Sequence, residues 1–124
     1  MRIEIMDMMI MLKTASLLFT AAALGGILMA GIRFSGRPRP PSWLAMGHGL
    51  MAAAGLTLLV YAWSNGGIPL LAQFATGLFI IAATGGAAMN LLFHAKQLPL
   101  PIPLMLVHAL LAVSAFVLLL LSVF

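Results

Sequence analysis

Four long apolar stretches restrict this chain more than any other feature of its sequence. None of them contains an Asp, Glu, Lys or Arg residue, and they span Thr14 to Ile32, Trp43 to Trp63, Leu70 to Phe93 and Leu104 to Phe124. Each is close to the ~20 residues that an α-helix needs to cross the ~30 Å hydrocarbon core of a bilayer. The sequence therefore predicts an all-α membrane protein, a bundle of four transmembrane helices in a single domain over residues 1–124.

The composition argues against a water-soluble protein. Of the 124 residues, 64% are hydrophobic and 6% are charged, which is more apolar surface than a small soluble core can bury. The formal net charge of +4 comes from basic residues beside the apolar stretches, and they form no groove or stripe for a nucleic acid. Because Cys is absent, disulfides, thiolate metal sites and covalent c-type haem attachment are excluded.

Segments rich in proline and glycine divide the chain into two helical hairpins. A loop is predicted between the two helices of each hairpin, at FSGRPRPPS (34–42) in the first and at HAKQLPLPIP (94–103) in the second. A short turn between the hairpins is predicted at SNGGIP (64–69). Residues 1–13 are expected to lie at the membrane interface or to continue the first helix outward. They contain both acidic residues of the chain, Glu4 and Asp7, so no paired carboxylates or Ser-His-acid arrangement for hydrolysis is available.

The basic residues predict the orientation of the bundle. The two loops within the hairpins share one side of the membrane, because two crossings separate them, and they contain Arg33, Arg37, Arg39 and Lys96. The opposite side has Arg2 and Lys13. Since cytoplasmic loops are enriched in Lys and Arg, we expect an integral membrane protein of the bacterial inner membrane with both termini outside the cytoplasm.

The two hairpins repeat each other at an interval of 60 residues. The aligned segments run from about 22 to 59 and from about 82 to 119, and they match at Ala22/Ala82, Gly25/Gly85, Gly26/Gly86, Met29/Met89, Pro41/Pro101, His48/His108 and Leu59/Leu119. Because each unit crosses the membrane twice, the copies have the same orientation. The repeat predicts a pseudo-twofold axis along the membrane normal.

The repeat places one pair of histidines at one depth. His48 and His108 each lie ~7 Å inside the start of their helices, at a rise of ~1.5 Å per residue, and Met29 and Met89 of the preceding helices reach the same layer. Small residues follow each histidine on its own helix face, namely Ala52 and Gly55 in one copy and Ala112 and Ala115 in the other. These small faces leave room for a flat macrocycle or, alternatively, allow close helix packing.

Three interpretations of the histidine pair are open. Ionisable residues inside a membrane are often kept for function, and no other titratable residue lies in the predicted membrane interior. The pair is therefore expected to ligate a cofactor, to make interhelical hydrogen bonds, or to form a proton or quinone site.

With His48 and His108 on helices two and four, the chain resembles the small b-type transmembrane cytochromes, whose four-helix bundles hold haem between histidines on facing helices. In topology the resemblance covers the whole chain, and at the site it consists of two residues, His48 and His108. It implies one six-coordinate haem b bound by His48 and His108, and an electron-transfer protein or oxidoreductase subunit that exchanges electrons with quinone. A second haem needs a second pair, but His94 aligns with Phe34.

Other residues and two other functions remain open. His94 is expected to contact lipid headgroups or to cap the third helix, or to act with Arg33 and Lys96 as a proton relay or a contact for haem propionates. A copper-binding or copper-transport site would use Met29, Met89, His48 and His108, because thioether and imidazole ligands suit Cu(I). In the last alternative, the chain is a cofactor-free accessory or assembly subunit that docks onto other membrane subunits.

Overall fold

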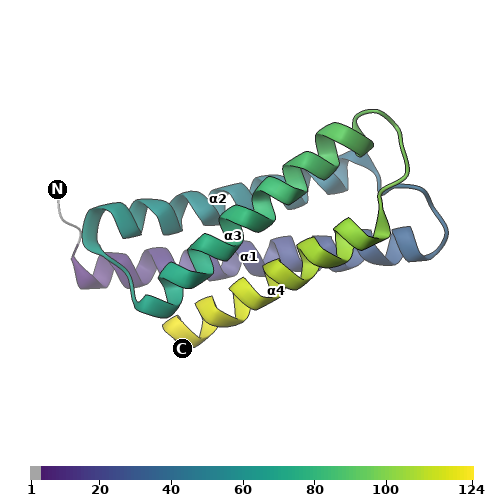
Figure 1. Ribbon diagram of the computed structural model, residues 1–124. Coiled ribbons are helices and arrows are strands. Elements are labelled where there is room, and N and C mark those ends of the chain that lie inside the picture. The colour runs from purple at the N-terminus through teal and green to yellow at the C-terminus, as the bar shows by residue number, and fades with distance from the viewer. Residues whose placement is uncertain (1–3) are drawn as a thin grey trace.

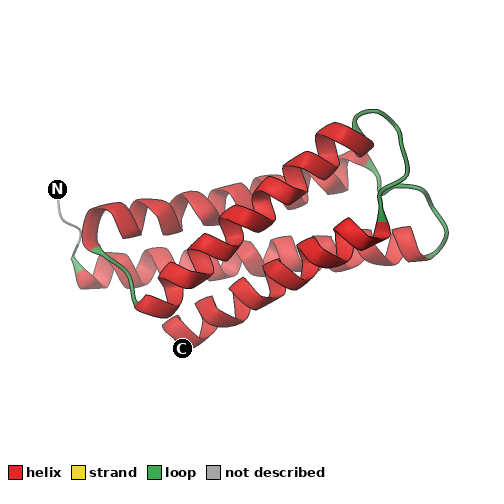
Figure 2. Cartoon of the chain, viewed as in Figure 1, coloured by secondary structure: helices red, strands yellow, loops and turns green. Residues whose placement is uncertain are grey.

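The computed structural model describes residues 4–124 and contains four long helices. They are α1 (Ile5–Phe34), α2 (Ser42–Gly66), α3 (Leu70–Met89) and α4 (Ile102–Val123), and a π-helical turn, η1 (Asn90–His94), extends α3. All four are long and apolar enough to cross a membrane, and they pack as one bundle (Figures 1 and 2). The predicted fold class is confirmed, and the chain is an integral membrane protein.

The bundle consists of two antiparallel hairpins. α1 packs mainly against α2 and α3 mainly against α4, while contacts of α1 with α4 and of α2 with α3 join the hairpins. α1 and α3 therefore stand on one diagonal of the bundle, and α2 and α4 stand on the other. The α1–α2 and α3–α4 loops lie together at one end, and the start of α1, the α2–α3 connection and the end of α4 lie at the opposite end (Figure 1).

The buried core repeats with the sequence interval of 60 residues. The buried positions of α1 are Leu12, Ala15, Ser16, Phe19 and Ala22, and those of α3 are Ala72, Ala75, Thr76, Phe79 and Ala82. Gly55 and Leu59 of α2 likewise match Ala115 and Leu119 of α4. The two hairpins therefore present equivalent faces to each other, as expected for the predicted duplication.

The buried hydroxyl groups are satisfied within their own helices. Ser16 Oγ donates to the carbonyl oxygen of Leu12 at 2.9 Å, and Thr76 Oγ1 donates to that of Ala72 at 2.7 Å. A hydroxyl in an apolar interior needs such an acceptor, because an unpaired polar group costs free energy there. These residues therefore belong to the packing of the core.

One helix start agrees with an expectation from the sequence, and one helix end differs from it. α1 begins at Ile5, so the described part of the N-terminal segment continues the first helix outward. α2 extends to Gly66 and leaves only Gly67–Pro69 as the connection, although SNGGIP predicts a turn from Ser64 onward. Ser64 and Asn65 side chains donate to the carbonyls one turn earlier, and Gly67, at φ 77°, ends the helix.

We expect Gly55→Ala to destabilise the bundle by about 1–3 kcal/mol, which is the usual cost of overpacking a core. A Cβ at position 55 would lie 2.9 Å from the Phe19 ring, whereas one at Gly47 of the same helix would meet nothing within 4 Å. The measurement is unfolding of the detergent-solubilised protein followed by circular dichroism, with Gly47→Ala as the control. Equal stability of the two variants would contradict this packing.

Candidate functional site

The two histidines are held in the same way by their own hairpins. His48 Nδ1 lies 2.7 Å from the carbonyl oxygen of Ala22 in α1, and His108 Nδ1 lies 2.8 Å from that of Ala82 in α3. A carbonyl oxygen only accepts hydrogen bonds, so each Nδ1 must carry the proton and donate it. The Nε2 atom of each neutral ring then has a free lone pair, which is the state that a metal ligand requires.

The histidine rings lie close together across the α2–α4 diagonal. Both side chains are half-buried, and their ring centres are 6.1 Å apart with an angle of 68° between the ring planes. Two imidazoles that bind one metal ion from opposite sides have ring centres roughly 6 Å apart, because each metal–nitrogen bond is about 2.0 Å. The separation therefore fits a single ion between the two rings.

Glycines allow each ring to lie against the neighbouring helix. A Cβ at Gly26 would lie 3.2 Å from His48 Cε1, and a Cβ at Gly86 would lie 3.1 Å from His108 Cε1. Each glycine is one turn beyond the alanine whose carbonyl accepts the Nδ1–H bond, so both lie on the same helix face. The double glycines of the repeat therefore leave α1 and α3 without side chains beside the histidines.

A second symmetric pair spans the other diagonal. The rings of Phe19 in α1 and Phe79 in α3 stack with their centres 3.7 Å apart and their planes 3° apart, and both side chains are buried. The sequence analysis missed this pair. The signal was available, because Leu18–Phe19 and Leu78–Phe79 are identical at the 60-residue interval.

The Phe19 ring occupies part of the space expected for a macrocycle. Its edge packs against Gly55, where an added Cβ would meet the ring at 2.9 Å. Of the two alternatives for the small residues, close helix packing therefore holds at Gly55, which accommodates an aromatic side chain of α1. Ala52 and Ala112, one turn nearer the histidines, are half-buried.

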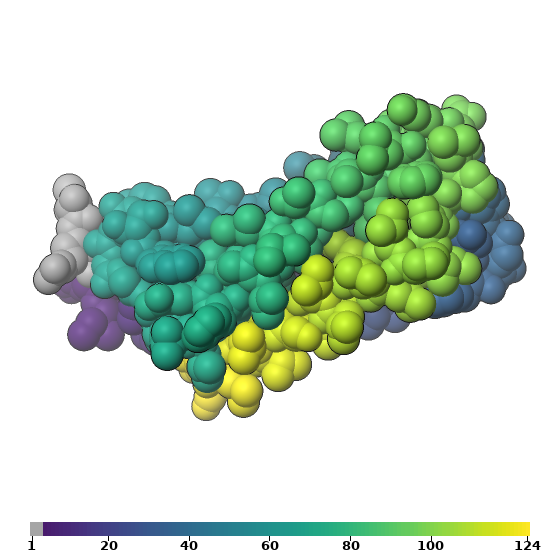
Figure 3. Space-filling model, viewed as in Figure 1, coloured from purple at the N-terminus to yellow at the C-terminus, as the bar shows by residue number. Residues whose placement is uncertain are grey.

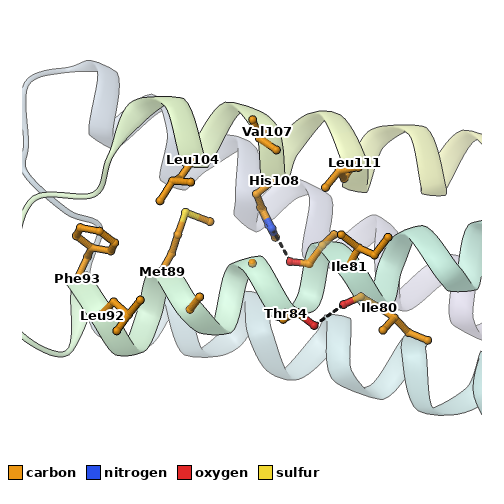
Figure 4. Close-up of a pocket in the computed structure, with 13 residues that line it drawn as sticks. Ile80, Ile81, Thr84, Met89, Leu92, Phe93, Leu104, Val107, His108 and Leu111 are labelled. Carbon is orange, nitrogen blue, oxygen red and sulfur yellow. Dashed lines mark hydrogen bonds between the residues drawn. The ribbon is translucent and has the colours of Figure 1, made fainter.

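An apolar groove of about 450 Å³ lies between α3 and α4. It runs between the two helices on the face shown in Figure 3, and the His108 ring points across it toward α3 in Figure 4. Met89 lines the same groove beside Leu104 (Figure 4), and its counterpart Met29 in α1 is half-buried. The groove is lined by one histidine of the pair, and it lies among helices long enough to be surrounded by lipid.

The other predicted site residues lie at the loop end of the bundle. His94 Nε2 is 3.2 Å from Ser42 Oγ, and Ser42 precedes His48 by about 9 Å along α2. Arg33 Nε donates to the carbonyl oxygen of Leu100 at 3.0 Å, and Lys96 is exposed in the α3–α4 loop. These three residues are therefore outside the histidine layer.

Hydrogen bonds between the two long loops fasten the hairpins together at this end. Arg39 Nη1 donates to the carbonyl oxygen of Gln97 at 2.8 Å, and the Leu100 amide donates to that of Pro38 at 3.0 Å. Together with the bond from Arg33 to Leu100, they join residues far apart in the sequence. Arg33 thus takes part in the hydrogen bonds that join the two hairpins.

Comparison of the chain with models of protein families, with curated proteins and with solved structures gives no match. The function is therefore inferred from the geometry of the chain's own residues.

Proposed function

We propose that the chain binds one haem b between His48 and His108 and transfers single electrons within the membrane. The observation that carries the proposal is the pair of imidazoles with ring centres 6.1 Å apart, each held through Nδ1 so that Nε2 is left for a ligand bond. Metal-bound histidines commonly donate their other ring N–H to a carbonyl or carboxylate, which fixes the tautomer and the orientation of the ring. The bonds to Ala22 and Ala82 have this form.

The number of ligands favours haem over a bare metal ion. Among residues 4–124, no group of three or more His, Cys, Asp or Glu side chains lies close enough to hold a metal ion. Two imidazoles leave a four-coordinate ion incomplete unless Met29 and Met89 also bind it, whereas a haem iron needs no ligands from the protein beyond the two imidazoles. Gly26 and Gly86 support the site in another way, because the absence of a side chain at these positions lets each histidine ring lie against the helix that holds it.

The chain's residues have three tasks in this function. His48 and His108 bind and orient the iron, the carbonyls of Ala22 and Ala82 hold the rings, and the apolar helices exclude bulk water. When bound, the haem supplies one-electron redox chemistry. Since the site lies within the helical span, its electron donor or acceptor is a membrane-dissolved quinone or a neighbouring membrane subunit.

Optical spectra and elemental analysis of the purified full-length protein test this proposal. We expect a Soret band, an α band on reduction, and one iron per chain recovered as non-covalent haem. Stoichiometric copper without these bands would replace the proposal with the copper site that uses Met29 and Met89. Purification in a larger complex without any cofactor would replace it with an accessory subunit.

For orientation, we propose that both termini face away from the cytoplasm of a bacterial inner membrane. The proposal follows from Arg33 at the end of α1 and from Arg37, Arg39 and Lys96 in the two loops, because cytoplasmic loops retain Lys and Arg. An alkaline phosphatase fused after Phe124 should be active, since this enzyme folds outside the cytoplasm, and one inserted after Gly36 should be inactive. The reverse pattern would contradict the orientation.

A further inference from the structure

We infer that the stacked Phe19–Phe79 pair sets the separation of the two histidine rings, so that these phenylalanines are positioning residues for the metal site. The functional consequence rests on the proposed haem site, but the spacing itself does not. Each phenylalanine lies on the helix whose alanine carbonyl accepts the histidine Nδ1–H bond of the same hairpin. Phe19 precedes Ala22, and Phe79 precedes Ala82, by about 4.5 Å along the helix.

The phenylalanine pair and the histidine pair are connected through helices α1 and α3. The Phe rings are stacked at 3.7 Å, so α1 and α3 cannot approach each other further without a clash between the rings. The carbonyls of Ala22 and Ala82 move with those helices, and they hold the histidine rings at 2.7 and 2.8 Å. The thickness of the aromatic stack therefore determines how far apart α1 and α3 hold the imidazoles.

The stack is imposed by the fold. Two aromatic rings prefer offset or edge-to-face arrangements with centres 4.5–7 Å apart, whereas this pair lies face to face at 3.7 Å. Gly55 of α2 is pressed against the Phe19 ring, and Ala115, the equivalent residue of α4, is fully buried. α2 thus confines the stack on the Phe19 side, and Ala115 of α4 belongs to the same buried core as both rings.

Pulsed electron paramagnetic resonance on the full chain tests the spacing without any cofactor. Because the chain has no cysteine, spin labels attach only at introduced positions, and Gly49→Cys and Ala109→Cys place them on exposed residues beside the two histidines. We expect one narrow distance distribution, and a shift or broadening when Phe19→Leu and Phe79→Leu are combined. An unchanged distribution would overturn the inference.

The control is a comparable loss of packing in the same core, one helical turn further from the histidines. Leu59 and Leu119 are fully buried and related by the same repeat, so Leu59→Ala with Leu119→Ala should lower stability and leave the label distance unchanged. A shift of the same size in this control would also overturn the inference, because any core defect would then move the histidines.

The second readout is the ligation state of the iron in haem-loaded protein. We expect the phenylalanine double variant to lose part of its six-coordinate, low-spin signal, and the leucine control to keep it. A fully low-spin phenylalanine variant would overturn the positioning role. If the wild-type protein binds no haem, the proposed function fails, and the label distances still decide whether the stack spaces the histidines.

Discussion

Replacement of either His48 or His108 by alanine is expected to remove the haem absorption of the purified protein or convert it to a five-coordinate spectrum. In the proposed site each imidazole would supply one bond to the iron, and within residues 4–124 no group of three or more His, Cys, Asp or Glu side chains could take its place. Loss of outer partners alone commonly costs 10–100-fold in metal affinity, so loss of a ligand should cost at least ~100-fold. Haem content and optical spectra of each variant provide the measurement.

The chain contains its own control for this experiment. His94 is the third histidine, and it contacts Ser42 at the loop end of the bundle. His94→Ala should therefore retain the wild-type spectrum and haem content. Added imidazole should restore the six-coordinate spectrum of His48→Ala or His108→Ala, because it fits the space that the side chain leaves. Wild-type spectra from both single variants would contradict the proposed ligation.

The second large effect is expected from side chains added beside the histidines. Gly26→Leu and Gly86→Leu would force the rings away from Ala22 and Ala82, since even a Cβ at these positions would lie 3.2 and 3.1 Å from the ring carbons. We expect about a 10–100-fold loss of haem affinity, as for the removal of partners that orient metal ligands. Haem titration of the purified variants measures this loss.

Two other glycines provide matched controls. Gly31 lies in α1 and Gly77 in α3, and a Cβ at either position would meet nothing within 4 Å. Gly31→Leu and Gly77→Leu should therefore bind haem as the wild type does. If all four variants lose haem equally, the effect comes from the helices in general, and the specific contact with the histidine rings is not responsible.

The sequence predicts the parts of this structure that depend on chain length and repetition. Apolar segments near the bilayer thickness predict four helices, and the 60-residue interval places Ala22, Gly26 and His48 at positions equivalent to those of the second hairpin. The structure adds that these three residues contact each other within one hairpin. Neither the choice of a carbonyl partner nor the 6.1 Å ring separation follows from spacing along the chain.

The Phe19–Phe79 pair shows why the core was harder to predict than the helices. In a membrane helix, apolar residues face both lipid and protein, so hydrophobicity does not distinguish the buried face. Leu17 is 72% exposed and Phe19 is 5% exposed, although both are apolar residues of the same helix. Which helices share a diagonal depends on the packing of the bundle, and the sequence interval alone does not determine it.

The π-helical turn at the end of α3 marks a departure from the repeat. Asn90–His94 forms this turn, while the equivalent residues of α1, Ala30–Phe34, continue a regular α-helix. At the end of this turn, His94 lies beside Ser42 at the start of α2. Short π-helical turns of this kind occur mostly as single turns within α-helices.

The most direct test of the central claim is the electron paramagnetic resonance spectrum of the oxidised, full-length protein. We predict one low-spin ferric signal that is lost in both His48→Ala and His108→Ala. The signal should be strongly anisotropic, because imidazole planes 68° apart leave the iron d orbitals nearly degenerate. A purely high-spin signal, or a low-spin signal that persists without either histidine, would contradict the proposed binding of one haem by His48 and His108.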